Sequence, residues 1–198
     1  MLLSQRQKDI LIGTILGDGH LEKNGKGVRL KVDHGMMQSG YLNWKYVEFK
    51  NLAPSKPRTI RSFHKKEQKF YERLHFATFS NGVFAEWRNL FYEQRVKIIP
   101  PNIDKILVSP LSLAVWFMDD GYKRNDCNAL RLNTDLFTYE EQELLQKCLY
   151  ANFGIISTIH RKGKTYNLYI PERASKKFCE LIRPYCLDSL LYKVSLTP

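Results

Sequence analysis

The stretch Leu11-Ile12-Gly13-Thr14-Ile15-Leu16-Gly17-Asp18-Gly19 decides how the chain is organised, because a stretch of the same kind follows in its second half. That second stretch is Leu113-Ala114-Val115-Trp116-Phe117-Met118-Asp119-Asp120-Gly121, and both are apolar blocks that end in an aspartate and a glycine. Asp18 and Asp120 are 102 residues apart, close to half of the 198-residue chain. A repeat at this spacing indicates a duplicated unit. We therefore predict an N-terminal half over 1–100 and a C-terminal half over 101–198.

Both apolar blocks are predicted to be helices. Ser4 is a suitable cap before the first block, and Ser109 followed by Pro110 provides a cap with proline at the first helical position of the second. Gly19 and Gly121 would end the two helices, because glycine is common just past a helix end.

A pair of glycines in the first block suits close packing of these helices. Gly13 and Gly17 are four residues apart, so they lie on one helix face and leave room for a second helix. The matching positions of the second block hold Val115 and Asp119, which predicts less tight packing there.

The segments that follow each block repeat the same order of strand and helix patterns. The predicted strands are 28–33, 59–63, 74–79, 129–133, 155–159 and 166–170, and the predicted later helices are 41–52, 84–91, 138–153 and 172–182. Thr138 and Glu141 have the spacing of a capping box. Each half is therefore predicted to be α+β, with roughly four strands in a sheet that helices cover on one face. The other face is left for a ligand.

The composition favours a globular protein with a polyanionic partner. The chain has 31 Lys and Arg against 20 Asp and Glu, a formal charge of +11, and it is 43% hydrophobic. Such a basic excess attracts nucleic acids. No run approaches the roughly 18 to 20 apolar residues of a membrane span, and polar residues follow Leu3 directly, unlike a secretory signal. We expect no membrane association, and either a prokaryotic cytoplasm or synthesis inside a mitochondrion or chloroplast.

The four cysteines, Cys127, Cys148, Cys179 and Cys186, contain no Cys-x-x-Cys pair, which argues against a zinc finger. Cys148 and Cys179 lie among apolar residues and are predicted to be buried free thiols in a reducing compartment.

The basic residues fall on predicted strands and on the turns between them. Between residues 56 and 75, seven Lys and Arg are opposed only by Glu67 and Glu72. Arg and Lys that alternate with apolar residues suit a sheet whose polar face enters the major groove. For any one basic turn, simple solvation is the alternative, and the face that a strand residue occupies depends on register. The candidates for DNA contact are Arg29, Lys31, Arg61, Lys65, Lys66, Lys69, Arg131, Asn133, Arg161, Lys162 and Lys164, with Lys65, Lys66 and Lys69 in a predicted turn.

The two motif aspartates are candidate ligands of a divalent cation. The C-terminal end of a helix carries partial negative charge, so something else must hold Asp18 and Asp120 there. If the two helices pack around a pseudo-two-fold axis, the carboxylates converge and need a cation or a raised pKa. Mg²⁺ prefers oxygen ligands beside phosphates, which predicts metal-assisted phosphodiester hydrolysis. One such block alone would indicate an ordinary core helix. Gly17 and Asp119, which precede the two aspartates, are secondary metal-site candidates.

The two motifs, their interval, the chain length and the charge together resemble the LAGLIDADG homing endonucleases, in the single-chain form with two motifs. Pro110, Leu113, Trp116 and the ending 117–121 are similar to the branch of intron-encoded enzymes that includes the yeast mitochondrial one. The resemblance implies two αββαββα halves, with the motif helices at the interface and the antiparallel sheets forming a DNA-binding saddle. It also implies that Asp18 and Asp120 bind the metals, as two or three Mg²⁺ ions for which Mn²⁺ can substitute. Val115 and Asp119 depart from the small residues common in the family.

The family often places a basic residue near each metal site, after the later helix of each half. Lys97 and Lys193 fit that place, 79 and 73 residues after Asp18 and Asp120. Their implied role is to polarise the water network or to offset phosphate charge. Exposed, solvated lysines are the alternative.

These features predict a monomeric, Mg²⁺-dependent, site-specific endonuclease that cuts both strands of DNA and promotes mobility of its host intron. A chain of this size has a radius of gyration of about 16 Å, so it could cover on the order of a dozen base pairs of a long, poorly symmetric site. An intron RNA maturase and a DNA-binding protein that does not cut remain the alternatives.

Overall fold

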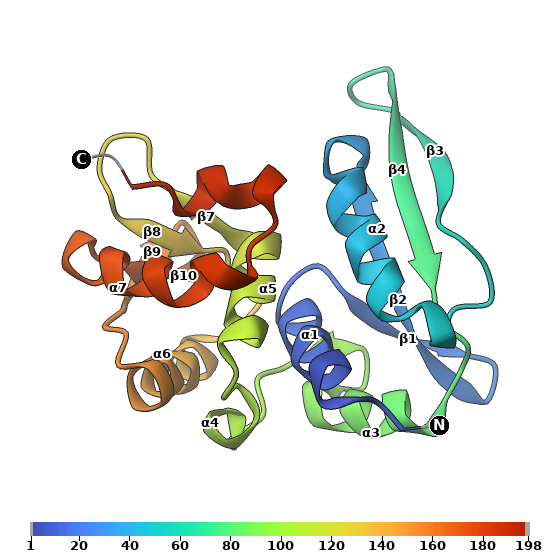
Figure 1. Cartoon of the computed structure of the whole chain (residues 1–198), viewed down its shortest axis with the longest axis horizontal. Helices are drawn as coiled ribbons and strands as arrows, with labels where there is room; N and C mark the ends of the chain where they lie inside the picture. Colours follow the sequence, from blue (N-terminus) through green and yellow to red (C-terminus); the bar gives the residue numbers. More distant parts are fainter. Residues whose placement is uncertain (1, 197–198) are drawn as a thin grey trace. The chain divides into compact units, whose positions relative to one another are not determined.

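The computed structural model describes residues 2–196, which fold into two compact α+β units (Figure 1). The N-terminal unit comprises Met1–Gln7 and Asp18–Arg88, and the C-terminal unit comprises Lys8–Gly17 and Asn89–Pro198. Most of the first helix, α1 (Gln5–Leu16), therefore belongs to the C-terminal unit. The division of the sequence at residue 100 describes the repeat and stays a prediction.

The N-terminal unit contains a four-stranded antiparallel sheet in the order β1-β2-β4-β3. Its elements are β1 (His20–Asn24), β2 (Gly27–Gly35), η1 (Met36–Gln38), α2 (Ser39–Glu48), η2 (Lys50–Leu52), β3 (Arg58–His64), β4 (Lys69–Ala77) and α3 (Gly82–Phe91) up to Arg88, after which the helix continues into the C-terminal unit. Along β2, buried Val28, Leu30 and Val32 alternate with half-exposed residues, as expected when helices cover one sheet face only. Helix α2 packs on β2 and β4 from that side.

The C-terminal unit repeats this sheet in the order β7-β8-β10-β9. Its elements are β5 (Tyr92–Glu93), β6 (Val96–Lys97), α4 (Ile103–Ile106), α5 (Pro110–Asp120), β7 (Gly121–Lys123), β8 (Leu130–Leu132), α6 (Tyr139–Phe153), β9 (Thr158–Lys162), β10 (Thr165–Ile170), α7 (Glu172–Ile182), η3 (Arg183–Tyr185) and η4 (Asp188–Val194). Helix α6 packs on β9 and β10. Two antiparallel sheets with the same strand order confirm the predicted α+β fold of duplicated halves.

The predicted helix starts are confirmed by their caps. The Ser4 Oγ accepts a hydrogen bond from the backbone N–H of Gln7 at 3.1 Å. The Ser109 side chain accepts one from the N–H of Leu111 at 3.2 Å, with proline at the first helical position. Thr138 forms the complete capping box of α6.

The predicted helix ends are partly wrong. Helix α1 ends at Leu16, so Gly17 and Asp18 form the turn that leads into β1. Helix α5 ends at Asp120 and Gly121 caps it, as predicted, but Gly121 has an extended backbone, with φ of −87°, and begins β7. A glycine is needed there because a Cβ would collide with the Phe117 ring.

The strand β4 begins earlier than predicted. Lys69 is its first residue and pairs with His64, so Lys69 does not lie in the turn. Similarly, Arg161 and Lys162 belong to β9. These hairpins extend beyond the apolar residues that marked them, because backbone pairing continues where the side chains are polar. The short strands β1 and β7 carry no clear alternation and are missed for the same reason.

The motif helices pack more tightly than the sequence predicts. Within the C-terminal unit, a Cβ added to Gly13 would lie 2.7 Å from the Cβ of Val115, and one added to Gly17 would lie 2.5 Å from the Cβ of Asp119. Such contacts leave no room for a side chain. The expectation of less tight packing is wrong because Gly13 in α1 and Gly17 just after it each face the larger residue at the matching position of α5.

All four cysteines are free thiols, and Cys148 and Cys179 are buried, as predicted. Burial raises the pKa of the Cys148 thiol to about 12 and that of Cys179 to about 11. Within residues 2–196, no helix has the length and apolar character needed to cross a bilayer.

Candidate nucleic-acid interface and metal centre

The register of the N-terminal sheet defines an outer face, opposite α2. Side chains alternate between the two faces along a strand, and residues that pair on neighbouring strands share a face. Lys31 and Asp33 on β2 pair with Ala77 and His75 on β4, so these four residues lie on the outer face. The cationic side chains on it are Arg29, Lys31, Arg58, Lys69 and Arg73. Arg29 and Lys31 lie 2.8 Å and 4.0 Å from Glu22, and Arg73 lies 3.6 Å from Asp33. The outer face is thus a basic surface with a minority of carboxylates.

Arg61 occupies the other face of the same sheet. It pairs with Glu72 on β4, the neighbour of Arg73 in the chain, and neighbouring residues of a strand point to opposite faces. The Arg61 guanidinium lies 4.1 Å from the centre of the Phe70 ring. Lys65 and Lys66 lie in the β3–β4 turn. The register therefore separates Arg61 from Arg29 and Lys31, with which the sequence grouped it.

The outer face of the C-terminal sheet, opposite α6, carries Arg131, His160, Lys162 and Tyr169. The Arg131 guanidinium lies 5.7 Å from the centre of the Tyr169 ring, and His160 stacks on Tyr169 at 4.2 Å. Lys162 forms an ion pair with Asp135 at 2.7 Å.

The remaining predicted contacts of this unit lie elsewhere. Arg161 pairs with Tyr166 on the side facing α6, and Lys164 lies in the β9–β10 turn. Asn133 follows β8 and donates its backbone N–H to the carbonyl oxygen of Asp120 at 3.0 Å.

Each outer face contains a histidine whose pKa lies below its ordinary value. For His75 the main cause is burial, and the positive charges of Lys31 and Arg58 lower the pKa further. The negative charge of Asp33 opposes them in part. For His160 it is burial, followed by Arg131 and Arg124. Both rings therefore favour the neutral form.

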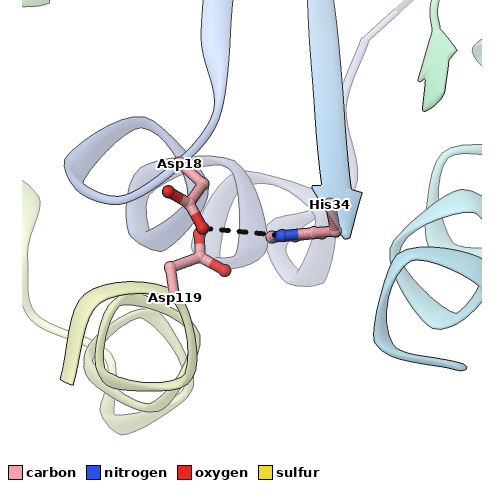
Figure 2. Close-up of side chains that lie close together, drawn as sticks. All are labelled: Asp18, His34 and Asp119. Carbon is pink, nitrogen blue, oxygen red and sulfur yellow. Dashed lines mark ion pairs between the residues drawn. The ribbon is translucent and has the colours of Figure 1, made fainter. Parts of the chain in front are cut away.

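Asp18 is the second residue after α1, and its side chain is 43% exposed. Its Oδ2 is 3.5 Å from the Nδ1 of His34, whose side chain is only 1% exposed. A dashed line in Figure 2 marks this contact. The figure also draws Asp119, a buried residue of the C-terminal unit. Asp120 is the last residue of α5 and is half-buried.

Lys97 and Lys193 both bind the backbone of a motif. The Lys97 Nζ donates to the carbonyl oxygen of Gly17 at 2.8 Å. The Lys193 Nζ donates to that of Met118 at 2.6 Å, and Lys193 is buried. The alternative of exposed, solvated lysines is therefore wrong. Lys193 also lines an open hollow of about 650 Å³, together with Tyr122, Lys123, Arg124, Asn125, Asp126, Arg131 and Tyr192.

Sequence reasoning missed several residues of this region. His34 follows Val28, Leu30 and Val32 at the same alternation, so a histidine in a core-facing position was a visible signal. Arg58, Arg73 and His75 were missed because their face follows from the pairing of β3 with β4, which a single sequence does not show.

Comparison with known proteins places this fold in the class of two-motif DNA endonucleases. Residues 8–178 match the LAGLIDADG DNA endonuclease family. The chain is 31% identical to the DNA endonuclease I-ChuI of Chlamydomonas applanata, over 98% of this chain and 97% of that protein. It is 30% identical to the cytochrome b mRNA maturase bI2 of Saccharomyces cerevisiae, over 93% of this chain but only 46% of the maturase. The chain therefore belongs to the LAGLIDADG DNA endonuclease family.

Solved structures support the same assignment. The homing endonuclease I-WcaI, bound to its DNA recognition sequence, matches 100% of this chain and 89% of its own, with a TM-score of 0.93 and 27% identity. I-DmoI in complex with DNA and Mn matches 92% of this chain and 98% of its own, with a TM-score of 0.56; at 16% identity it supports the fold alone.

Proposed function

We propose that this protein is a site-specific, Mg²⁺-dependent endonuclease that cuts both strands of DNA at a long, poorly symmetric site and so promotes mobility of its host intron. The observation that carries the proposal is the repeated binding of a lysine to each motif: Lys97 to the Gly17 carbonyl and Lys193 to the Met118 carbonyl. A lysine bound close to each of the two motif aspartates is compatible with one reactive site for each DNA strand. Family membership supports the same activity.

The side chains suit a hard divalent cation. Asp18 and Asp120 supply carboxylate oxygens, the ligands that Mg²⁺ prefers, and Asp18 is accessible to an ion. Bound Mg²⁺ would activate water for attack and stabilise the leaving oxygen.

The chain's own residues would position the DNA around such a centre. The basic outer faces would hold phosphates and read base edges in the major groove. Lys193 and the basic side chains of its hollow would offset the charge that develops on the scissile phosphate. We propose Lys97 for the same role at the other motif. The protein would act as a monomer, in a prokaryotic cytoplasm or an organelle.

Digestion of intron-free host-type DNA with Mg²⁺, followed by mapping of the double-strand ends, tests this function. The wild type should give one discrete break, and Asp18→Asn and Asp120→Asn should each abolish or cripple it while binding is retained. Asp104→Asn is a matched control because Asp104 is an exposed aspartate of α4, outside both motifs and outside the Lys193 hollow. Full cutting by either motif variant would contradict the site. Tight binding without any break would contradict the nuclease.

An intron RNA maturase is the second candidate. The similarity to maturase bI2 favours it, and so does the exposed pair of Phe63 and Phe70, whose ring centres are 4.9 Å apart. Exposed aromatic rings suit the stacking of unpaired bases, which RNA loops offer and duplex DNA does not. Affinities for intron RNA and duplex DNA at one salt concentration would separate the candidates. Loss of RNA binding alone in Phe70→Ala would support the maturase.

A further inference from the structure

Three buried side chains of the N-terminal unit, those of His34, Lys45 and Tyr41, lie in contact one after another, and the first of them contacts Asp18. The His34 Nδ1 is 3.5 Å from the Asp18 Oδ2, and the His34 Nε2 is 3.4 Å from the Lys45 Nζ. Lys45 is fully buried in α2, with its Nζ 4.5 Å from the centre of the Tyr41 ring. Figure 2 shows the end of this series at which the His34 ring points to the carboxylate.

The partner on each ring nitrogen determines where the proton of a neutral His34 lies. A lysine ammonium has three donors and no acceptor, so the Nε2 that faces Lys45 must offer its lone pair. The proton then lies on Nδ1, and the Nδ1–H is directed at the Asp18 carboxylate. Lys45 thus selects the tautomer, as the second partner of a histidine generally does.

We propose that His34 is a positioning residue for Asp18 and that Lys45 sets the tautomer in which it acts. This inference rests on the proposed function, in which Asp18 is a metal ligand. The Nδ1–H would hold Oδ2 and so orient the Asp18 carboxylate before an ion binds. Hydrogen bonds of this kind to a ligating carboxylate typically change metal affinity or activity by about 10- to 100-fold.

The C-terminal unit has a different buried pair between its second strand and the following helix. There the Thr134 hydroxyl donates to Gln142 Oε1 at 2.9 Å, and the Gln142 amide donates to the backbone carbonyls of Thr134, Phe137 and Tyr166. That pair is uncharged. If each motif aspartate serves one DNA strand, loss of His34 should slow the strand served by Asp18 more than the other.

The tautomer can be measured without metal, DNA or activity. In the metal-free protein labelled with ¹⁵N-histidine, the His34 ring should show protonation at Nδ1, and Lys45→Met should redistribute the proton toward Nε2. Protonation of wild-type His34 at Nε2 alone would overturn the inference. This result does not depend on whether the protein cuts DNA.

Strand-resolved nicking at low Mg²⁺ tests the consequence, with the two strands as internal controls. His34→Leu should slow one strand by about tenfold or more relative to the other, with DNA affinity unchanged. His34→Asn, whose amide N–H takes the place of Nδ1–H, should restore the lost rate. Equal rates on both strands in His34→Leu, or no rescue by Asn, would overturn the positioning role. If the wild type cuts no DNA, the proposed function fails separately.

Discussion

Lys193 donates from its Nζ to the carbonyl oxygen of Met118, two residues before Asp120, at 2.6 Å. Lys97 does the same to Gly17, one residue before Asp18, at 2.8 Å. The two lysines come from different local structures, a 3₁₀ segment and a two-residue strand. In each motif, a backbone carbonyl one or two residues before the final aspartate therefore holds a lysine charge in place.

Removal of these charges should slow cleavage more than binding. We expect Lys97→Met and Lys193→Met each to lower the cleavage rate by about 10²-fold or more, the range for loss of one preorganised donor, while duplex affinity changes little. Single-turnover cleavage and a binding assay measure the two quantities. Lys105→Met, at an exposed position of α4, is the control. An equal loss of affinity and rate would instead indicate a simple phosphate contact.

The tight packing of the motif helices predicts opposite effects for two glycines. Gly13→Ala should destabilise the protein by about 1–3 kcal/mol, because the new methyl group would overlap Val115 and the backbone of α5. Gly40→Ala, also inside a helix but with nothing within 4 Å, should stabilise it by up to about 1 kcal/mol. Urea unfolding measures both. A Gly13→Ala variant as stable as the wild type would show that the helices can separate without cost.

The register of the N-terminal sheet predicts which cations contact DNA. Lys31→Gln, on the outer face, should weaken binding and reduce the slope of log K against log salt by about one. Arg61→Gln, on the opposite face, should leave the slope unchanged. Equilibrium binding at four salt concentrations would resolve the difference. The reverse result would mean that DNA approaches the helix-covered face.

The lowered pKa of His75 predicts that stability falls on mild acidification. Burial and Lys31 are the main causes. The unfolded chain takes up the proton near pH 6.5 and the folded chain only at lower pH, so the free energy of unfolding decreases as the pH falls below about 6.5. Urea unfolding at pH 7.5 and 5.5 should show this decrease, and His75→Gln should reduce it. An unchanged decrease in the variant would assign the effect to other groups, such as His160.

Helix positions could largely be predicted from the sequence, because their determinants are local. The helix α7 has the predicted bounds, and Thr138 forms the predicted cap of α6. Each predicted strand overlaps an observed one, but the predicted strand 155–159 shares only Thr158 and Ile159 with β9. The strands β1 and β7 were missed because three to five residues with mixed polarity give no periodicity. The candidate site could be predicted only in part. The repeat makes Asp18 and Asp120 candidate metal ligands, and this stays a prediction. His34 and Lys45 are 11 residues apart and meet only when β2 and α2 pack together, which the sequence does not show.

The sequence by itself determined the duplication, the basic charge and the two motif aspartates, because each is a property of residue identity and spacing along the chain. Only the tertiary structure decided that Arg61 lies on a different sheet face from Lys31. The same holds for the packing of Gly13 against Val115 and of Gly17 against Asp119. It holds also for the contact between Lys45 and His34. These relationships depend on strand register and on side-chain contact between distant segments. A shift of one residue in register would reverse the first of them, and no local pattern fixes that register.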